Sequence, residues 1–190
     1  MQNPKIYLDH ASTTYVDPRV LQAMLPYFSE EYGNAESLHS KGKSAKIALD
    51  SARETIAKIL NCSPSEIIFT SGGTESNNLA IFGTARHAYR QAGANKDKGK
   101  HLITTQIEHS SVLESFKKLE KEGFEVTYLK VDSEGFVNPA DFMSAIRPDT
   151  IMASIMYANN EIGTIEPIKE LGKICHDNRD KKIIFHTDAC

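Results

Sequence analysis

The sequence predicts an α/β fold of three layers, in which a mostly parallel β-sheet has helices on both of its faces. Two observations lead to this prediction. From residue 67 onward, short apolar runs alternate with segments of helical periodicity, which is the pattern of βαβ units. The length of 190 residues, with 40% hydrophobic and 25% charged residues, is enough for one well-buried core, so we expect one domain or part of one.

The first third of the chain is expected to be mainly helical. Residues 1–16 are predicted to be extended. Asp17 followed by Pro18 predicts a helix start, with the aspartate as N-cap and the proline at the first helical position. We expect that helix to run to about Phe28. Apolar residues at helical spacing between Ala45 and Leu60 predict a long amphipathic helix.

Predicted strands and helices alternate in the rest of the chain. The apolar runs predict strands at 67–69, 101–105, 126–131, 151–156 and 182–187. A helix is expected from Thr74 to a polar loop at 92–100. The next helix should have Ser110 or Ser111 as its N-cap and Gly123 just after its end. Two further helices are predicted at 139–146 and 167–178.

Composition excludes several classes of protein. A net charge of −3 gives no reason to expect nucleic acid or a membrane surface as a partner. There is no apolar run as long as a membrane span and no signal-peptide core, so we expect a cytoplasmic protein. The three cysteines have neither CxxC nor zinc-ligand spacing, and no metal site is predicted. The chain stops directly after an apolar run, which we interpret as a chain that has been cut or continues elsewhere.

Polar residues follow the predicted strands, where ligands bind in open α/β sheets. At the carboxyl ends of the predicted strands lie, in chain order, Gly73 with Thr74, Glu108 with His109, Asn159 with Asn160, and His186 with Asp188. The glycine turn before a helix suits a phosphate, although it is neither a P-loop nor a dinucleotide fingerprint.

Taken singly, most of these features have an ordinary structural explanation. The glycines serve a turn, His109 a helix entry, and the two asparagines a loop. Asp188 is harder to explain in this way, because a carboxylate at the end of an apolar strand needs a partner. That partner is either structural or a protonated ring nitrogen of a cofactor.

Together, however, these residues resemble the motifs of cysteine desulfurases, the aminotransferase class V branch of the fold-type I enzymes that use pyridoxal 5′-phosphate (PLP). The matching stretches occur in the family's order and span the chain: residues 6–14, 17–20, 70–78, 108–109, 154–156 with 159–163, and 186–189. The resemblance implies that residues 17–190 are part of a PLP-binding large domain, incomplete at its C-terminus. Residues 1–16 would contribute to the small domain or to the edge of the site.

The resemblance also implies roles for particular residues. Gly73 and Thr74 would bind the PLP phosphate, and His109 would be a catalytic residue that stacks on the pyridine ring. Asn160 would hydrogen-bond the O3′ side of the ring. Asp188 would pair with the pyridinium nitrogen, where an ionised aspartate makes the ring a better electron sink. Three further residues, His10, Ala11 and Asn34, would lie near the substrate.

The reaction implied by the resemblance converts L-cysteine to L-alanine and leaves the sulfur on the enzyme as a persulfide. The sulfur would pass to an acceptor protein, such as an iron–sulfur scaffold or a thiolation partner, and the enzyme would be a homodimer. In the family, the Schiff-base lysine and the nucleophilic loop cysteine lie beyond the position of Cys190. We therefore expect the 190-residue chain alone to be inactive, and we interpret Cys62 and Cys175 as structural or incidental.

Other functions stay open at this point. One alternative is another class V PLP enzyme, either a selenocysteine lyase or an aminotransferase. A second alternative is a non-catalytic scaffold that reuses the fold. A nucleotide-binding Rossmann protein is less favoured because the fingerprint is missing.

Overall fold

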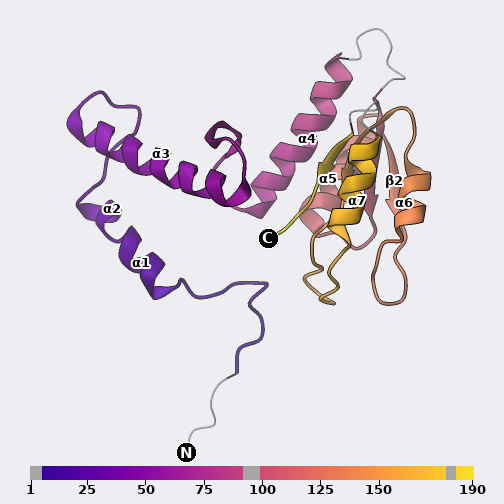
Figure 1. Cartoon of the computed structure of the whole chain (residues 1–190), viewed down its shortest axis with the longest axis horizontal. Coiled ribbons are helices and arrows are strands. Elements are labelled where there is room, and N and C mark those ends of the chain that lie inside the picture. The colour runs from indigo at the N-terminus through magenta and orange to yellow at the C-terminus, as the bar shows by residue number, and fades with distance from the viewer. Residues whose placement is uncertain (1–5, 92–98, 179–182) are drawn as a thin grey trace, which may run out of the picture. The chain divides into compact units, whose positions relative to one another are not determined.

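The computed structural model describes residues 6–91, 99–178 and 183–190. The chain divides into two compact units, residues 1–69 and residues 70–190, and each is described by itself (Figure 1). The boundary that the resemblance implies at residue 16 is a different one and stays a prediction. The predicted loop at 92–100 lies mostly outside the described residues.

Unit 1 contains three α-helices and a short 3₁₀ helix: α1 (Pro18–Met24), α2 (Pro26–Ser29), α3 (Ser40–Leu60) and η1 (Pro64–Glu66). Asp17 is the N-cap of α1, as predicted, and its Oδ1 accepts a hydrogen bond from the backbone N–H of Arg19 at 2.8 Å. The prediction of one helix to Phe28 is wrong. The helix is interrupted at Leu25, because Pro26 has no N–H to donate to the preceding turn.

The long amphipathic helix is confirmed as α3, which begins five residues earlier than Ala45. It ends at Asn61, whose φ of 53° is the left-handed conformation common at helix ends. Within α3 only Gly42 and Ala57 are buried, so its apolar stripe is largely exposed. The strand predicted at 67–69 is wrong, since these residues have no regular structure and Ile68 is 67% exposed. A strand requires a hydrogen-bonding neighbour, and an apolar run does not supply one.

Unit 2 contains a parallel sheet of four strands: β1 (His101–Thr105), β2 (Glu125–Leu129), β3 (Thr150–Ser154) and β4 (Ile184–His186). The order across the sheet is β2-β1-β3-β4. All four strands correspond to predicted ones, with ends that differ by at most two residues. Residue 182, where the last strand was expected to begin, lies outside the described residues.

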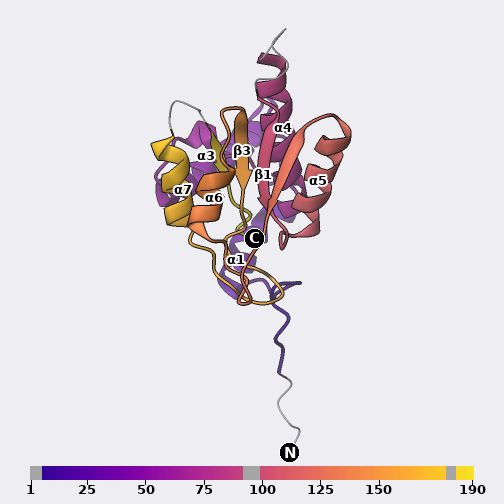
Figure 2. The same ribbon diagram turned by 90° about the vertical axis from the view of Figure 1, so that its right-hand side faces the viewer.

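Helices cover both faces of this sheet (Figure 2). They are α4 (Gly73–Gln91), α5 (Ser110–Lys121), α6 (Pro139–Ala145) and α7 (Ile168–Asp177). One buried cluster joins α4 and α5 to Leu102 and Met152 of the sheet. The other joins α6 and α7 to Ile103 and Ala153, the next residues along the same strands. Successive strand residues point to opposite faces, so each strand feeds both cores, and the three-layer prediction is confirmed.

The ends of α5 test the capping predictions. Its N-cap is His109, not Ser110 or Ser111, because the ring Nδ1 accepts the backbone N–H of Ser111 at 3.2 Å. Gly123 follows the C-cap with φ 95°, as predicted for a residue that must be left-handed. None of the helices in the described part of the chain is long and apolar enough to cross a bilayer.

Candidate functional site

The strand order reverses between β1 and β3. The chain leaves β1 through α5 on one face of the sheet, and it leaves β3 through α7 on the other face. Such a reversal opens a crevice at the carboxyl ends of the two strands, where α/β proteins bind their ligands. His109 follows β1 at this edge, Asn160 follows β3, and Asp188 follows the neighbouring β4.

The N-terminus of α4 contributes the glycine turn. The first backbone hydrogen bond of the helix runs from Ser76 N to Gly72 O, so the N–H groups of Gly73 and Thr74 have no carbonyl partner within the helix. A Cβ added to Gly73 would lie 2.7 Å from the Cys190 Sγ, so a side chain at this position would require the Cys190 side chain to move. The turn therefore exposes backbone N–H donors at the positive end of a 19-residue helix.

Asp188 is half-buried and held on three sides. Its Oδ2 accepts from Asn77 Nδ2 at 2.8 Å, and its Oδ1 accepts from Cys190 N at 3.2 Å. Its backbone carbonyl accepts from Tyr157 N at 2.7 Å, which joins it to the exit of β3. Burial raises the pKa of the Cys190 thiol, and the nearby Asp188 carboxylate adds to that effect.

His109 is connected to the same group. Its Nδ1 lies 2.8 Å from Ser111 Oγ, which in turn accepts from Asn77 Nδ2 at 2.9 Å. The structure thus brings His109 and Asp188 together through Asn77 and Ser111. The sequence offered Ser111 only as a candidate N-cap and Asn77 only as part of the motif 70–78, so neither residue was predicted to belong to the site. A signal was present for Asn77, because it lies at i−4 and i−8 from the buried Ile81 and Ala85 and is therefore a polar residue on the core face of α4.

The two asparagines after β3 have different environments. Asn159 is buried, its Oδ1 accepts the N–H groups of Glu161 and Ile162, and its Nδ2 donates to Ile107 O at 2.9 Å. Asn160 is exposed within the loop that Asn159 fixes. The bond to Ile107 ties the exit of β3 to the exit of β1, so Asn160 is held beside the segment that carries His109.

Glu108 is a buried carboxyl group between the same two exits. Its Oε1 accepts from Thr105 Oγ1 at 2.8 Å and from Met156 N at 2.9 Å, whereas its Oε2 has no partner. Burial raises the pKa of Glu108 to about 7, the two donors oppose this, and the charges of Asp188 and Glu166 add to it. Thr187 Oγ1, next to Asp188, is likewise buried without a partner.

The three residues expected near the substrate belong to unit 1. His10 Nδ1 lies 2.9 Å from Thr14 Oγ1, and Ala11 is exposed in the same turn. The Asn34 Oδ1 accepts from Glu36 N at 2.9 Å, which is an Asx turn. Their part in substrate binding stays a prediction.

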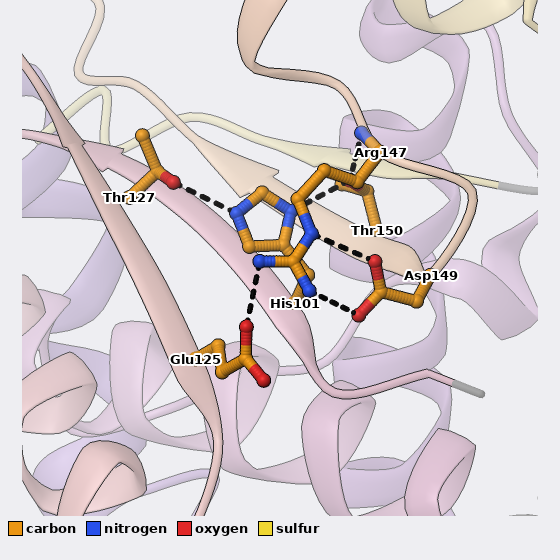
Figure 3. Close-up of polar contacts among 6 residues, drawn as sticks. All are labelled: His101, Glu125, Thr127, Arg147, Asp149 and Thr150. Atoms are coloured by element: carbon orange, nitrogen blue, oxygen red, sulfur yellow. Dashed lines mark hydrogen bonds and ion pairs between the residues drawn. The ribbon is translucent and has the colours of Figure 1, made fainter. Parts of the chain in front are cut away.

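A second polar cluster lies at the opposite, amino-terminal edge of the sheet (Figure 3). Fully buried His101 bonds Thr150 Oγ1 through Nδ1 at 2.7 Å and Thr127 Oγ1 through Nε2 at 2.8 Å. Above the ring, the Arg147 guanidinium makes two hydrogen bonds to the Asp149 carboxylate, at 2.9 and 2.8 Å, and one to Glu125 at 2.6 Å. Burial lowers the pKa of His101, and the Arg147 charge lowers it further. His101 is therefore a buried packing residue.

Metal chemistry finds no support in the side chains. Across residues 6–91, 99–178 and 183–190, no group of three or more His, Cys, Asp or Glu side chains is placed to hold a metal ion.

Residues 6–190 match the family model described as aminotransferase class-V. The chain belongs to the aminotransferase class V family. The resemblance stated from the sequence motifs is therefore confirmed, and enzymes of this family depend on PLP.

Similar proteins point to one branch of the family. The chain is 52% identical over 187 residues to cysteine desulfurase IscS of Clostridium botulinum, and that match covers 98% of this chain and 45% of the relative. Against cysteine desulfurase IscS of Methanosarcina thermophila it is 52% identical over 188 residues, which covers 99% of this chain and 44% of the relative. The chain thus spans about half the length of the curated relatives it matches.

Solved structures agree. A NifS-like protein superposes with a TM-score of 0.88 at 40% identity, over 98% of this chain and 49% of that one. DndA from Streptomyces lividans superposes with a TM-score of 0.80 at 41% identity, over 97% of this chain and 49% of that one.

The residues at the carboxyl edge fit PLP. A phosphate group suits the N–H donors of the first turn of α4, where Gly73 leaves the backbone uncovered. A carboxylate such as that of Asp188 suits the protonated nitrogen of a pyridine ring. Beside Asp188, the buried Thr187 Oγ1 has no hydrogen-bond partner among the described residues.

Proposed function

We propose that the protein is a PLP-dependent cysteine desulfurase, which converts L-cysteine to L-alanine and passes the sulfur to an acceptor protein. One observation carries the proposal. The Asp188 carboxylate lies at the carboxyl edge of the sheet, together with the N-terminus of α4 and His109. Asn77 and Cys190 N orient this carboxylate through hydrogen bonds. The names of the relatives, cysteine desulfurase IscS, favour this reaction over the other activities of the family.

Five residues of the chain would hold the cofactor. The backbone of Gly73 and Thr74 would bind the phosphate, and the Asp188 carboxylate would keep the ring nitrogen protonated. His109 would lie on the ring face and act as the catalytic residue, and the Asn160 amide would bond the O3′ side. When bound, PLP supplies a conjugated electron sink that stabilises negative charge at the reacting carbon of an amino acid.

The neighbours of these residues prepare them for that task. Asn77 and Cys190 N hold the carboxylate oxygens of Asp188 in one orientation before a ligand arrives. Asn159 fixes the loop of Asn160 with three hydrogen bonds. Because these donors are already in place, little conformational entropy is lost when the ring binds.

We further propose a cytoplasmic homodimer whose substrate pocket includes His10, Ala11 and Asn34. The sulfur acceptor would be a protein such as an iron–sulfur scaffold. The homodimer, the sulfur acceptor and the roles of the three residues rest on the family resemblance; His10 and Ala11 belong to the matching stretch 6–14, and Asn34 lies outside the matching stretches.

Binding of PLP tests the cofactor assignment. Loss of the charge-assisted bond in Asp188→Ala removes about 1.5–3 kcal/mol, so we expect about 10- to 100-fold weaker binding of PLP in a fluorescence titration. The matched control is Asp141→Ala, an exposed aspartate in the first turn of α6, which should bind PLP as the unaltered chain does. Equal affinity in all three proteins would remove Asp188 from the site.

Product analysis tests the reaction. The protein as it occurs in the cell, supplied with L-cysteine and a thiol reductant, should release L-alanine and sulfide in equal amounts. A transaminated product, or sulfide without alanine, would instead support another class V activity.

A further inference from the structure

Four side chains form one continuous hydrogen-bonded series across the candidate site. The series runs from Asp188 Oδ2 to Asn77 Nδ2 (2.8 Å), from the same nitrogen to Ser111 Oγ (2.9 Å), and from Ser111 Oγ to His109 Nδ1 (2.8 Å). Its two inner members are buried, with Asn77 3% and Ser111 9% exposed. The series joins α4, α5 and the segment after β4, which are far apart in the sequence.

Chemistry fixes the direction of the two bonds that Asn77 makes. A carboxylate oxygen only accepts, so the amide group of Asn77 must present its NH₂ to Asp188. The second N–H of that NH₂ donates to Ser111 Oγ. Since the hydroxyl already accepts from Asn77, its own proton is free to point at His109 Nδ1.

The backbone imposes the same direction at the far end. The N–H of Ser111 also donates to His109 Nδ1, at 3.2 Å. Nδ1 therefore accepts two hydrogen bonds and carries no proton in the neutral ring. The single ring proton must then reside on Nε2.

We infer that Asn77 and Ser111 are positioning residues that link Asp188 to His109 and fix the imidazole proton on Nε2. In the link, the orientation of the Asp188 carboxylate and the tautomer of His109 depend on each other. Rotation of the Asn77 amide would place its carbonyl oxygen against a carboxylate, which is repulsive. Asp188 therefore keeps the NH₂ of Asn77 directed at Ser111 Oγ, which leaves the serine proton for His109 Nδ1 and the ring proton on Nε2. The inference deepens the proposed function and rests on it only where it says that these two residues face PLP.

The tautomer of His109 is the direct readout, and it requires no cofactor. The chain is labelled with ¹⁵N-histidine, and the two ring-nitrogen shifts of His109 are measured by long-range ¹H–¹⁵N correlation above neutral pH. A His109→Gln variant identifies the signals. In the unaltered chain we expect widely separated shifts, with the protonated nitrogen at Nε2.

Two substitutions interrupt the link at different points. In Asn77→Leu and in Ser111→Ala we expect the two shifts to move toward each other, because only the longer bond from Ser111 N then opposes the other tautomer. Ser111→Thr keeps the hydroxyl and should restore the original shifts. The matched control is Ser115→Ala, a buried serine one turn further along α5 whose hydroxyl bonds Ser111 O instead of the histidine.

The outcomes distinguish an effect on the hydrogen bonds between Asp188 and His109 from a general structural effect of the substitution. Unchanged His109 shifts in a folded Ser111→Ala chain would overturn the inference, as would an equal change in Ser115→Ala. Should Asn77→Leu fail to fold, the serine variants decide the question alone.

A second readout connects the link to PLP. We expect Asn77→Leu to weaken PLP binding about tenfold, the size of one lost hydrogen bond to a charged group. If the unaltered chain does not bind PLP, the cofactor contacts proposed for Asp188 and His109 fail, while the tautomer measurement still decides whether Asn77 and Ser111 connect the two residues. If PLP binds equally to the unaltered chain and to Asn77→Leu, the link does not position Asp188 for the cofactor.

Discussion

The two edges of one parallel sheet carry polar clusters of opposite character. At the amino-terminal edge, both ring nitrogens of buried His101 are bonded, and the Arg147 guanidinium has two carboxylate partners (Figure 3). At the carboxyl edge, buried groups are left over. Of the residues described, four have a buried side-chain oxygen without a partner: Thr104, Glu108, Glu166 and Thr187. Glu108 and Thr187 follow the carboxyl ends of β1 and β4, Thr104 is the last residue but one of β1, and Glu166 lies in the loop between β3 and α7.

This difference separates a structural cluster from a binding cluster. Leaving a buried polar group unpaired costs about 1–3 kcal/mol, so a protein tolerates several at one edge only where they serve a purpose. A sheet must have polar ends, because backbone groups there need partners. At one end those partners come from the protein, and at the other a ligand is expected to supply part of them.

Among these substitutions, removal of His101 from the fully hydrogen-bonded cluster at the amino-terminal edge should lower the free energy of unfolding the most. His101→Ala leaves a cavity in the sheet and removes the partners of two buried threonine hydroxyls. We expect a loss of about 3 kcal/mol in the free energy of unfolding, measured by urea denaturation. His87→Ala is the control, since His87 is exposed on α4 and its ring Nε2 bonds the nearby side chain of Gln91; it should cost less than about 0.5 kcal/mol. A cost below about 1 kcal/mol for His101→Ala would mean that the cluster does not support the sheet.

At the carboxyl edge, Glu108 should make the free energy of unfolding depend on pH. Burial raises the pKa of Glu108 to about 7 in the folded chain from its ordinary value of 4.5, so the folded state binds more protons between these two pH values. Its stabilising contribution is therefore full below pH 4.5 and is lost as the pH rises toward 7. Glu108→Gln does not titrate. The stability of the variant minus that of the unaltered chain should increase by about 2–3 kcal/mol between pH 4.5 and pH 7.5.

Urea denaturation at a series of pH values measures this difference. His101 contributes with the opposite sign in both proteins. Its pKa is lowered by burial, so its contribution is present above pH 6.5 and is lost as the pH falls. A difference curve that is flat with pH would show that folding does not raise the pKa of Glu108.

The smallest effect should come from the surface part of the fully hydrogen-bonded cluster at the amino-terminal edge. Arg147→Lys replaces two parallel bonds to Asp149 by a single point charge. Because the arginine side chain is 42% exposed, solvent screens the pair, and we expect a loss of only about 0.5–1 kcal/mol by urea denaturation. A loss as large as that of His101→Ala would mean that the ion pairs, and not the buried ring, hold this edge together.

The sequence predicted unit 2 better than unit 1. In unit 2 alternating apolar runs and helical periods match the strands and helices closely, because each strand pairs with a neighbour and each helix covers a face. The run 67–69 is also apolar, but it has no neighbouring strand to pair with among the described residues, and it forms no strand. Pro26 was visible in the sequence, and its missing N–H explains the break that the periodicity concealed.

The sequence predicted which residues follow the strands at the candidate site, but not which side chains connect them by hydrogen bonds. Strand exits pointed to His109, Asn160 and Asp188, because the carboxyl ends of parallel strands meet at one edge. Which side chains join them depends on rotamers and on the packing of α4 against α5, which periodicity does not determine. The bonds of Asn77 to Ser111 and to Asp188, across 34 and 111 positions of the chain, are of this kind.

His109 is both the expected catalytic ring and the N-cap of α5. Because His109 has both roles, His109→Ala removes the ring and destabilises the start of α5 at the same time. A loss of activity in that variant would therefore have two explanations. Asparagine is among the best N-cap residues, so His109→Asn removes the imidazole while keeping a cap. Only the asparagine variant can therefore attribute a lost activity to chemistry, and the difference between the two variants measures how much of the alanine phenotype is a folding defect.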